Sequence, residues 1–299
     1  MIKFNDTVIN VGKFPNNESF IDLGITREMK CIKNNNILFK FENDAEFMYL
    51  KFLKDFLDDN GIKNITLTMP YIPYSRMDRK EEKRLFTLKS VAKFINELNF
   101  ESVVVWEPHS DVSVALFDRI KVMNTTHELA MKLMFNLSGL ANKPEKFRTE
   151  KDAYEVIKDE CLLNDIYLIY PDNGAAKRYE KQFKYEKFIT CKKNRDFNTG
   201  RINSLELELD NDCIRPKVAI IVDDLSSRGG TFQLTAQKLK EQLNVEKIYL
   251  VVTHCENTIF DGEVLDGDVI TEVHTTDSIL TTDKRHNKLF VDKQLINLF

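Results

Sequence analysis

The residues Lys-Val-Ala-Ile-Ile-Val-Asp-Asp-Leu-Ser-Ser-Arg-Gly-Gly-Thr occupy positions 217–231. The run from Val218 to Val222 is short, uninterrupted and rich in β-branched residues, which is typical of a strand buried on both faces of a parallel sheet. Two carboxylates follow this run, and a helical pattern begins at Phe232, after Gly229-Gly230-Thr231. Free backbone N–H groups in such a turn, together with the dipole of the next helix, favour a bound phosphate. The alternative is an ordinary strand-to-helix turn. The carboxylates themselves suit sugar hydroxyls, or a hydroxyl and a metal ion.

The composition sets limits on the class of protein. The chain has 299 residues, enough for two domains of about 150 residues each. A net charge of -4 does not favour nucleic acid or an anionic membrane as a partner. No apolar run approaches the roughly 20 residues of a membrane span, and the first residues do not resemble a signal peptide. The five cysteines form no Cys-x-x-Cys pair, so we expect a cytoplasmic protein with reduced thiols and no zinc site.

Each half of the chain alternates apolar runs with helical periodicity, which predicts an α/β fold with two mainly parallel sheets flanked by helices. In the first half, strands are predicted at 37–41, 65–69 and 102–106, and helices at 47–57 and 87–98. A further helix is predicted at 126–137, before the domain boundary. In the second half, strands are predicted at 166–169, 187–191, 218–222, 247–252 and 269–273, with a helix at 232–243. The polar segment 136–151 predicts a boundary between domains at 1–142 and 143–299. The apolar pattern of 288–299 is expected to form a last helix that packs back on the first domain.

Candidate functional residues in the first half lie in turns and at strand exits. Residues 13–19 predict a turn with an exposed aromatic side chain, Phe14; a plain loop is the alternative. The exit of the strand at 65–69 carries aromatic rings with Arg76 and Arg79, which can supply stacking faces and phosphate donors, although a solvated charge run has the same composition. His109 follows the strand at 102–106, where ligands of parallel sheets bind, although a lone histidine is more often structural.

The second half repeats this arrangement. Asp172 lies at the end of the strand predicted at 166–169, just before a helix that begins near Ala175. Residues 192–201 are polar and basic without an apolar period, which predicts a mobile loop. It is either a solvated loop or a lid whose cations close over phosphates.

Taken together, these motifs resemble the ribose-phosphate diphosphokinases (phosphoribosyl diphosphate synthetases), in family order and nearly from end to end. This family transfers the terminal diphosphate of ATP to the C1 hydroxyl of ribose 5-phosphate. The resemblance implies two tandem domains like those of type I phosphoribosyltransferases, usually assembled as homodimers or hexamers. It also implies ATP as co-substrate and Mg²⁺ as the metal ion.

The resemblance assigns roles residue by residue. ATP would be bound by residues that match the family's nucleotide segments: Phe14, Asn16, Glu18, Arg76, Asp78 and His109. In the family, the segment that matches 14–18 is contributed by a neighbouring subunit, and Phe14 would stack on adenine. The magnesium site would use His109 and Asp172. Lys193 and Arg195 match the catalytic Lys-x-Arg pair. The sugar phosphate would be held by the acidic pair and the loop after it: Asp223, Asp224, Ser227, Arg228, Gly229, Gly230 and Thr231.

The sequence departs from the family at Ser227 and Arg228, where an acid and a threonine are usual. This exchange adds about two units of positive charge beside the 5-phosphate of the sugar. In one interpretation Arg228 faces solvent and ribose 5-phosphate remains the acceptor. In the other, the 5-phosphate of the acceptor continues into further phosphate, as in ADP-ribose, which would connect the protein to NAD metabolism.

Two other functions share parts of this pattern. A phosphoribosyltransferase would need the central loop but not the ATP-site motifs at 13–19, 71–80 and 107–111. A non-catalytic regulatory relative would be expected to have lost the lysine–arginine pair or the metal-site residues. The presence of Lys193, Arg195, His109 and Asp172 therefore favours an enzyme.

Overall fold

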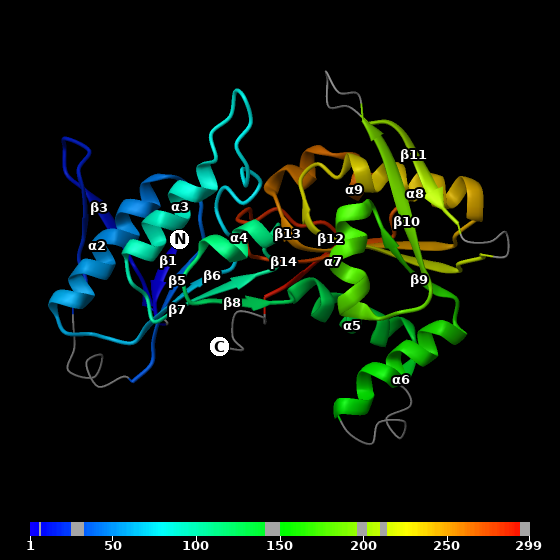
Figure 1. Cartoon of the computed structure of the whole chain (residues 1–299), viewed down its shortest axis with the longest axis horizontal. Helices are drawn as coiled ribbons and strands as arrows, with labels where there is room; N and C mark the ends of the chain where they lie inside the picture. The colour runs from blue at the N-terminus through cyan, green and yellow to red at the C-terminus, as the bar shows by residue number, and fades with distance from the viewer. Residues whose placement is uncertain (6, 25–32, 141–149, 196–201, 210–213, 294–299) are drawn as a thin grey trace. The chain divides into compact units, whose positions relative to one another are not determined.

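A computed structural model describes the chain (Figure 1) at all positions except 6, 25–32, 141–149, 196–201, 210–213 and 294–299. The described residues separate into two compact units, Met1–Met123 and Asn124–Phe299. The sequence predicted the division later, after residue 142. The difference arises because helix α5 (Thr125–Leu137) packs on two strands of the second unit, β12 (Val218–Ser226) and β13 (Lys247–Cys255).

The first unit is built on a sheet with the strand order β2-β1-β5-β6-β7-β8. Four strands of this sheet run parallel: β5 (Asn35–Phe39), β6 (Ile65–Met69), β7 (Ser102–Trp106) and β8 (Ile120–Met123). Strand β1 (Ile2–Phe4) is antiparallel to β5 and to β2 (Thr7–Val8). A separate antiparallel pair is formed by β3 (Val11–Lys13) and β4 (Ser19–Ile21).

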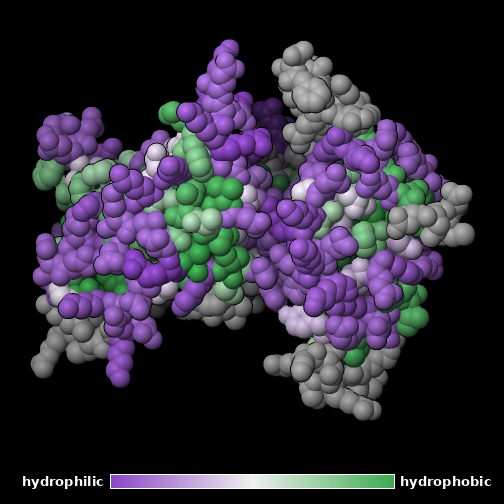
Figure 2. Space-filling model, viewed as in Figure 1, coloured by the Kyte–Doolittle hydropathy of each residue, from purple (hydrophilic) through white to green (hydrophobic). Residues whose placement is uncertain are grey.

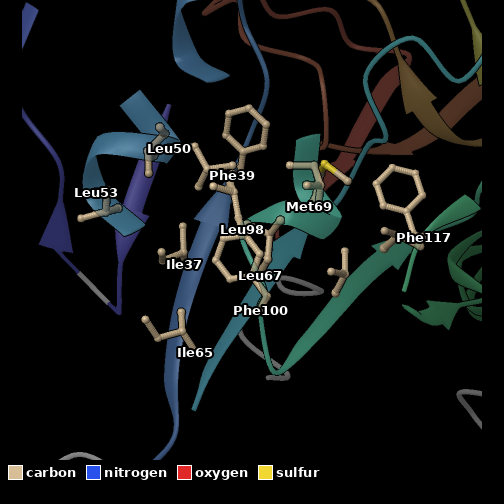
Figure 3. Close-up of a cluster of buried hydrophobic side chains, with 14 of the residues drawn as sticks. Ile37, Phe39, Leu50, Leu53, Ile65, Leu67, Met69, Leu98, Phe100 and Phe117 are labelled. Atoms are coloured by element: carbon tan, nitrogen blue, oxygen red, sulfur yellow. The ribbon is translucent and has the colours of Figure 1, made fainter. Parts of the chain in front are cut away.

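Helices α2 (Ala45–Asp59) and α3 (Thr87–Glu97) bury one apolar stripe each in the core of this unit. Figure 3 shows Leu50 and Leu53 of α2 beside Ile37 of β5, and the same cluster includes Leu67 and Phe100. A short helix, α4 (Asp111–Leu116), follows β7. The stripes have the i, i+3, i+4 spacing of an amphipathic helix, so the periodicity of the sequence is sufficient to explain which faces are buried.

The second unit has the strand order β11-β10-β9-β12-β13-β14-β15. Strand β11 (Ile202–Glu208) is antiparallel to β10 (Phe188–Arg195), and all other neighbours are parallel. The remaining strands are β9 (Ile166–Tyr170), β14 (Glu272–Thr276) and β15 (Leu289–Asp292). The helical elements are α5, α6 (Glu150–Leu163), α7 (Asn173–Phe183), α8 (Gly230–Leu243), η3 (Asn257–Asp261) and α9 (Glu263–Asp266).

Alternate side chains of β12 face the two helical layers of this unit. Ile221 packs in the cluster of Phe232 and Leu239 from α8, whereas Ile220 and Val222 pack in the cluster of α5 to α7. Figure 1 shows α7 crossing in front of the strands. The central strand is therefore buried on both faces, as the unbroken apolar run predicts.

These two units confirm the predicted α/β class with parallel sheets flanked by helices. The prediction of a helix in the last apolar segment is wrong at Leu289–Asp292, because these residues form β15 alongside β14; positions 294–299 lie outside the described residues. None of the described helices is long and apolar enough to cross a bilayer, and polar residues cover most of the face seen in Figure 2.

Candidate functional site

In the first unit, two neighbouring parallel strands end in the segments that carry candidate residues. Strand β6 leads to residues 70–78 and β7 leads to residues 107–111, and the Trp106 N–H donates to the carbonyl oxygen of Pro70 at 3.1 Å. Arg76 is exposed, whereas Asp78 and His109 are half-buried. Ser110 then caps α4 by accepting a hydrogen bond from the Ser113 N–H. The fold thus places these residues after adjacent strands at one sheet edge, where ligands of parallel sheets bind.

The predicted turn with an exposed aromatic side chain is the tip of the β3–β4 pair. The Phe14 N–H donates to the Glu18 carbonyl oxygen at 2.9 Å, and Glu18 N–H donates to the Asn16 Oδ1 at 3.2 Å. The Phe14 ring is 52% exposed and lies 4.7 Å, between centroids, from the ring of Phe20. The hairpin therefore presents an exposed aromatic ring that is available for stacking.

In the second unit, both carboxylates of the central segment lie within β12 and not after it. Asp223 is paired with Val252 of β13, and the ladder continues to Ser226 and Cys255. Asp223 is half-buried, whereas Asp224 is only 4% exposed. The carboxyl groups of these two neighbouring acids lie close to each other.

Asp172 connects two elements of this unit. Its Oδ1 atom caps α7 by accepting from the Ala175 N–H at 3.0 Å, and its Oδ2 atom accepts from Lys193 Nζ at 2.8 Å. Burial alone would raise the pKa of Asp172, but the hydrogen bonds from Lys193 and Ala175 outweigh burial and lower it. Asp172 is therefore held as a carboxylate before any ligand binds.

Lys193 lies on a strand, so the prediction of a loop over 192–201 is wrong at its start. Residues 192–195 end β10 and pair with β11, with Lys193 opposite Leu205. The side chain of Lys193 is buried on one face, whereas that of Lys192 points to the other and binds Glu208 at 2.7 Å. The polar composition of this segment gave no sign that its side chains alternate between a buried and an exposed face, because a lysine in a polar run is expected to be exposed. Arg195 ends the strand, and 196–201 lie outside the described residues.

Sequence analysis missed Arg178, on α7. Its Nη1 atom lies 3.3 Å from Oδ1 of the buried Asp224, and its guanidinium stacks over the Tyr179 ring. The signal was present, because Ala175, Tyr179 and Phe183 form the buried stripe of α7 and Arg178 occupies a position on the same face.

Asp223 has a different environment from its neighbour. Burial and the nearby carboxylates of Asp224 and Asp172 raise its pKa well above the usual value. Its Oδ1 accepts the Asp224 N–H at 2.9 Å, and no cation among the described residues forms an ion pair with it. Asp172, Asp223 and Asp224 thus form a cluster of acids. Among the described residues, Lys193 pairs with Asp172 and Arg178 pairs with Asp224.

The loop after β12 is packed closely on the segment around α9. Gly229 has a φ of 76°, and a Cβ atom there would lie 2.2 Å from the Val264 Cγ2. A Cβ atom at Gly262 would lie 2.0 Å from the Arg228 carbonyl oxygen. Gly229 is therefore favoured by its positive φ and by the close Val264 side chain, and Gly262 is required by the close approach of the Arg228 backbone. Helix α8 begins at Gly230, so the first N–H groups of the helix, including that of Thr231, lack intrahelical acceptors.

The two residues that depart from the family pattern lie on this loop. Ser227 is half-buried, and the Arg228 side chain is exposed. Among the described residues, no side chain or backbone group forms an ion pair or a hydrogen bond with the Arg228 guanidinium.

The sequence and the fold both resemble those of known proteins. Residues 2–98 match the family described as the N-terminal domain of ribose phosphate pyrophosphokinase. The ribose-phosphate pyrophosphokinase of Sulfurisphaera tokodaii is 28% identical over 89% of this chain and 82% of that protein. The enzyme of the same name from Saccharolobus solfataricus is 24% identical over 81% of this chain and 74% of that protein.

The solved phosphoribosylpyrophosphate synthetase from Mycobacterium smegmatis shares the fold, with a TM-score of 0.69 at 20% identity. The match covers 97% of this chain and 87% of that structure. Residues 2–98 therefore match the model of the N-terminal domain of this family, and the chain is similar along most of its length to proteins named ribose-phosphate pyrophosphokinase.

Proposed function

We propose that this protein transfers the diphosphate of ATP to the C1 hydroxyl of ribose 5-phosphate and releases AMP. The observation that carries the proposal is the acid cluster Asp172–Asp223–Asp224 with its buried Lys193, placed beside a glycine loop at the start of α8. Carboxylates and free backbone N–H groups are the two chemistries that a sugar phosphate needs, for its hydroxyls and its phosphate respectively.

The reaction joins the C1 oxygen of the sugar to the β-phosphorus of ATP and breaks the bond from that phosphorus to the α–β bridging oxygen. The C1 hydroxyl loses its proton, and AMP departs with the electron pair of the broken bond. Such transfer depends mainly on positioning and on neutralising charge. We assign the second task to Lys193 and Arg195.

ATP binding is assigned to the first unit. Phe14 offers its exposed face to adenine, beside Asn16 and Glu18, while Arg76 and Asp78 follow β6 and His109 follows β7. A cation such as Arg76 at a strand exit suits phosphate oxygens.

The residues also fit a magnesium ion. Asp172 is an ionised carboxylate with one oxygen held by a lysine that can exchange partners. No group of three His, Cys, Asp or Glu side chains converges as a metal site among the described residues, and Mg²⁺ bound through ATP phosphates needs only one or two protein ligands. In the second unit Asp172 would hold it, and it would neutralise phosphate charge.

Cytoplasmic location and a homo-oligomer, dimer or hexamer, belong to the same proposal. Buried, unpaired thiols at Cys161, Cys191 and Cys255 support a reducing compartment. The oligomer follows from the family resemblance.

The test is an assay of the purified protein with ATP, Mg²⁺ and ribose 5-phosphate. We expect AMP and a new sugar 1-diphosphate, detected by chromatography and by phosphorus NMR, in equal amounts. Omitting the sugar should abolish AMP. If no ribose phosphate elicits AMP, the proposal is wrong, and the alternative of a non-catalytic relative returns.

ADP-ribose is a second candidate acceptor, and the exposed Arg228 favours it. In the described structure its guanidinium has no protein partner, and its backbone is fixed against Gly262 at the phosphate loop. A guanidinium can bind the second phosphate of such an acceptor as a fork.

The acceptor prediction compares Arg228→Gln with the wild type on both acceptors. If ADP-ribose is the substrate, we expect kcat/KM for it to fall at least about tenfold, the loss of one charge-assisted hydrogen bond, with ribose 5-phosphate little affected. Lys238→Gln, a cation on α8 that pairs with Glu241, is the control. A wild type that forms no AMP with ADP-ribose excludes this acceptor.

A further inference from the structure

Arg178 is a charged residue that lies in the interior of the second unit at the sugar site. It projects from the buried stripe of α7 toward β12, where its Nη1 atom is 3.3 Å from Asp224 Oδ1. The Asp224 side chain is almost fully buried and that of Arg178 is 23% exposed. A carboxylate in such surroundings stays ionised at little cost only when a cation accompanies it.

The surroundings of Arg178 hold it in one position. Its guanidinium lies 5.7 Å from the centre of the Tyr179 ring, and the Tyr179 hydroxyl donates to Thr126 Oγ1 at 3.4 Å. Thr126 in turn donates to the backbone carbonyl of Asp223 at 3.3 Å and contacts Thr253 Oγ1 at 2.8 Å. One connected set of contacts from α5 and α7 therefore fixes both the side chain of Asp224 and the backbone of Asp223.

The two adjacent acids consequently have unequal environments. Asp224 forms an ion pair with Arg178 of α7, whereas Asp223 is half-buried, accepts the Asp224 N–H and has its carboxyl group next to that of Asp224. A sugar hydroxyl needs an acceptor with free lone pairs, and a carboxylate that accepts one backbone bond has several left.

We propose that Arg178 is a positioning residue of the sugar site, which holds Asp224 ionised and fixed so that Asp223 is presented to the hydroxyls of the sugar phosphate. The inference rests on the proposed function, since it assigns the sugar site to this acid pair. Without Arg178, the buried Asp224 carboxylate would lose the cation of this ion pair while it remains next to Asp223. Asp224 would then have to take up a proton or turn away, and either change would displace Asp223, its chain neighbour.

The experiment compares Arg178→Met with Arg178→Lys in the full-length protein. For Arg178→Met we expect the KM for ribose 5-phosphate to rise at least about tenfold, with the KM for ATP within about twofold of wild type. Arg178→Lys keeps the charge and should recover most of the sugar affinity. Lys177→Met, at an exposed position of the same helix, should match the wild type. Calorimetric binding of ribose 5-phosphate without ATP should show the same order of affinities.

A double variant tests whether Arg178 acts through Asp224. Arg178→Met/Asp224→Asn removes both charges, so its sugar KM should be no higher than that of Arg178→Met alone. Increases that multiply in the double variant would overturn the proposal, as would a normal sugar KM in a folded Arg178→Met protein. If the wild type forms no AMP, the proposed function fails instead. The coupling of Arg178 to Asp224 is then measured by thermal unfolding of the wild type, Arg178→Met, Asp224→Asn and the double variant. If the two single substitutions change the stability independently, the ion pair itself is refuted.

Discussion

Replacing Lys193 with alanine is expected to lower kcat at least about a hundredfold while the affinity for the sugar phosphate stays nearly unchanged. In the proposed reaction Lys193 neutralises charge on the transferring diphosphate, and a well-placed donor of this kind contributes roughly 3 kcal/mol to the transition state. The Lys193 side chain is buried and its ammonium group is held by Asp172, so it is positioned before the substrates bind. The measurement is the kcat and both KM values under saturating Mg²⁺.

Lys192 provides a matched control on the same strand. It is one residue away, points to the opposite face and pairs with Glu208 at an exposed position. Lys192→Ala should therefore retain turnover within about twofold. A weakened sugar affinity with normal turnover in Lys193→Ala would contradict the catalytic role.

A metal-binding measurement separates loss of the donor from damage to the acid cluster. Lys193→Ala leaves the Asp172 carboxylate without its cation, so binding of Mn²⁺ with an ATP analogue, followed by electron paramagnetic resonance, should be retained or stronger. If metal binding were lost together with turnover, the rate effect would come from disruption of the site and not from a missing donor.

The sequence predicts the central layers of the fold well and their edges poorly. Strands at Ile65–Met69 and Ser102–Trp106 have the predicted bounds, because a run buried on both faces is recognised from apolar residues alone. Strand β12 continues four residues past Val222 to Ser226, since pairing with β13 outweighs the low strand preference of aspartate. Tertiary pairing of this kind leaves no local signal.

The candidate site shows the same division. The acids and the glycine loop were predicted because each lies where a predicted strand ends. Arg178 was missed because a charge within an amphipathic helix looks solvated until its partner, Asp224, is placed opposite it. The buried position of Lys193 likewise depends on the register of β10 with β11, which the composition of the loop does not specify.

The two neighbouring acids should have opposite effects on stability when each is replaced by asparagine. Asp224→Asn leaves the half-buried Arg178 without its carboxylate, and breaking a buried pair in this way costs about 3–5 kcal/mol. Asp223→Asn instead removes a carboxylate that is crowded by two others. Its amide oxygen can still accept the Asp224 N–H, so we expect a gain in unfolding free energy of about 1 kcal/mol at neutral pH.

The pH dependence of the gain identifies its cause. The pKa of Asp223 is raised in the folded protein, so the unfolded chain loses this proton first as the pH increases, and the wild type loses stability from near the ordinary aspartate pKa up through the raised one. The advantage of Asp223→Asn should therefore be larger at pH 8 than at pH 5, measured by urea unfolding at both pH values. The same variant should bind ribose 5-phosphate poorly, because the acid that destabilises the ligand-free fold is the one offered to the sugar. Equal effects of the two substitutions, or a gain independent of pH, would show that the surroundings of Asp223 do not disfavour its charged form.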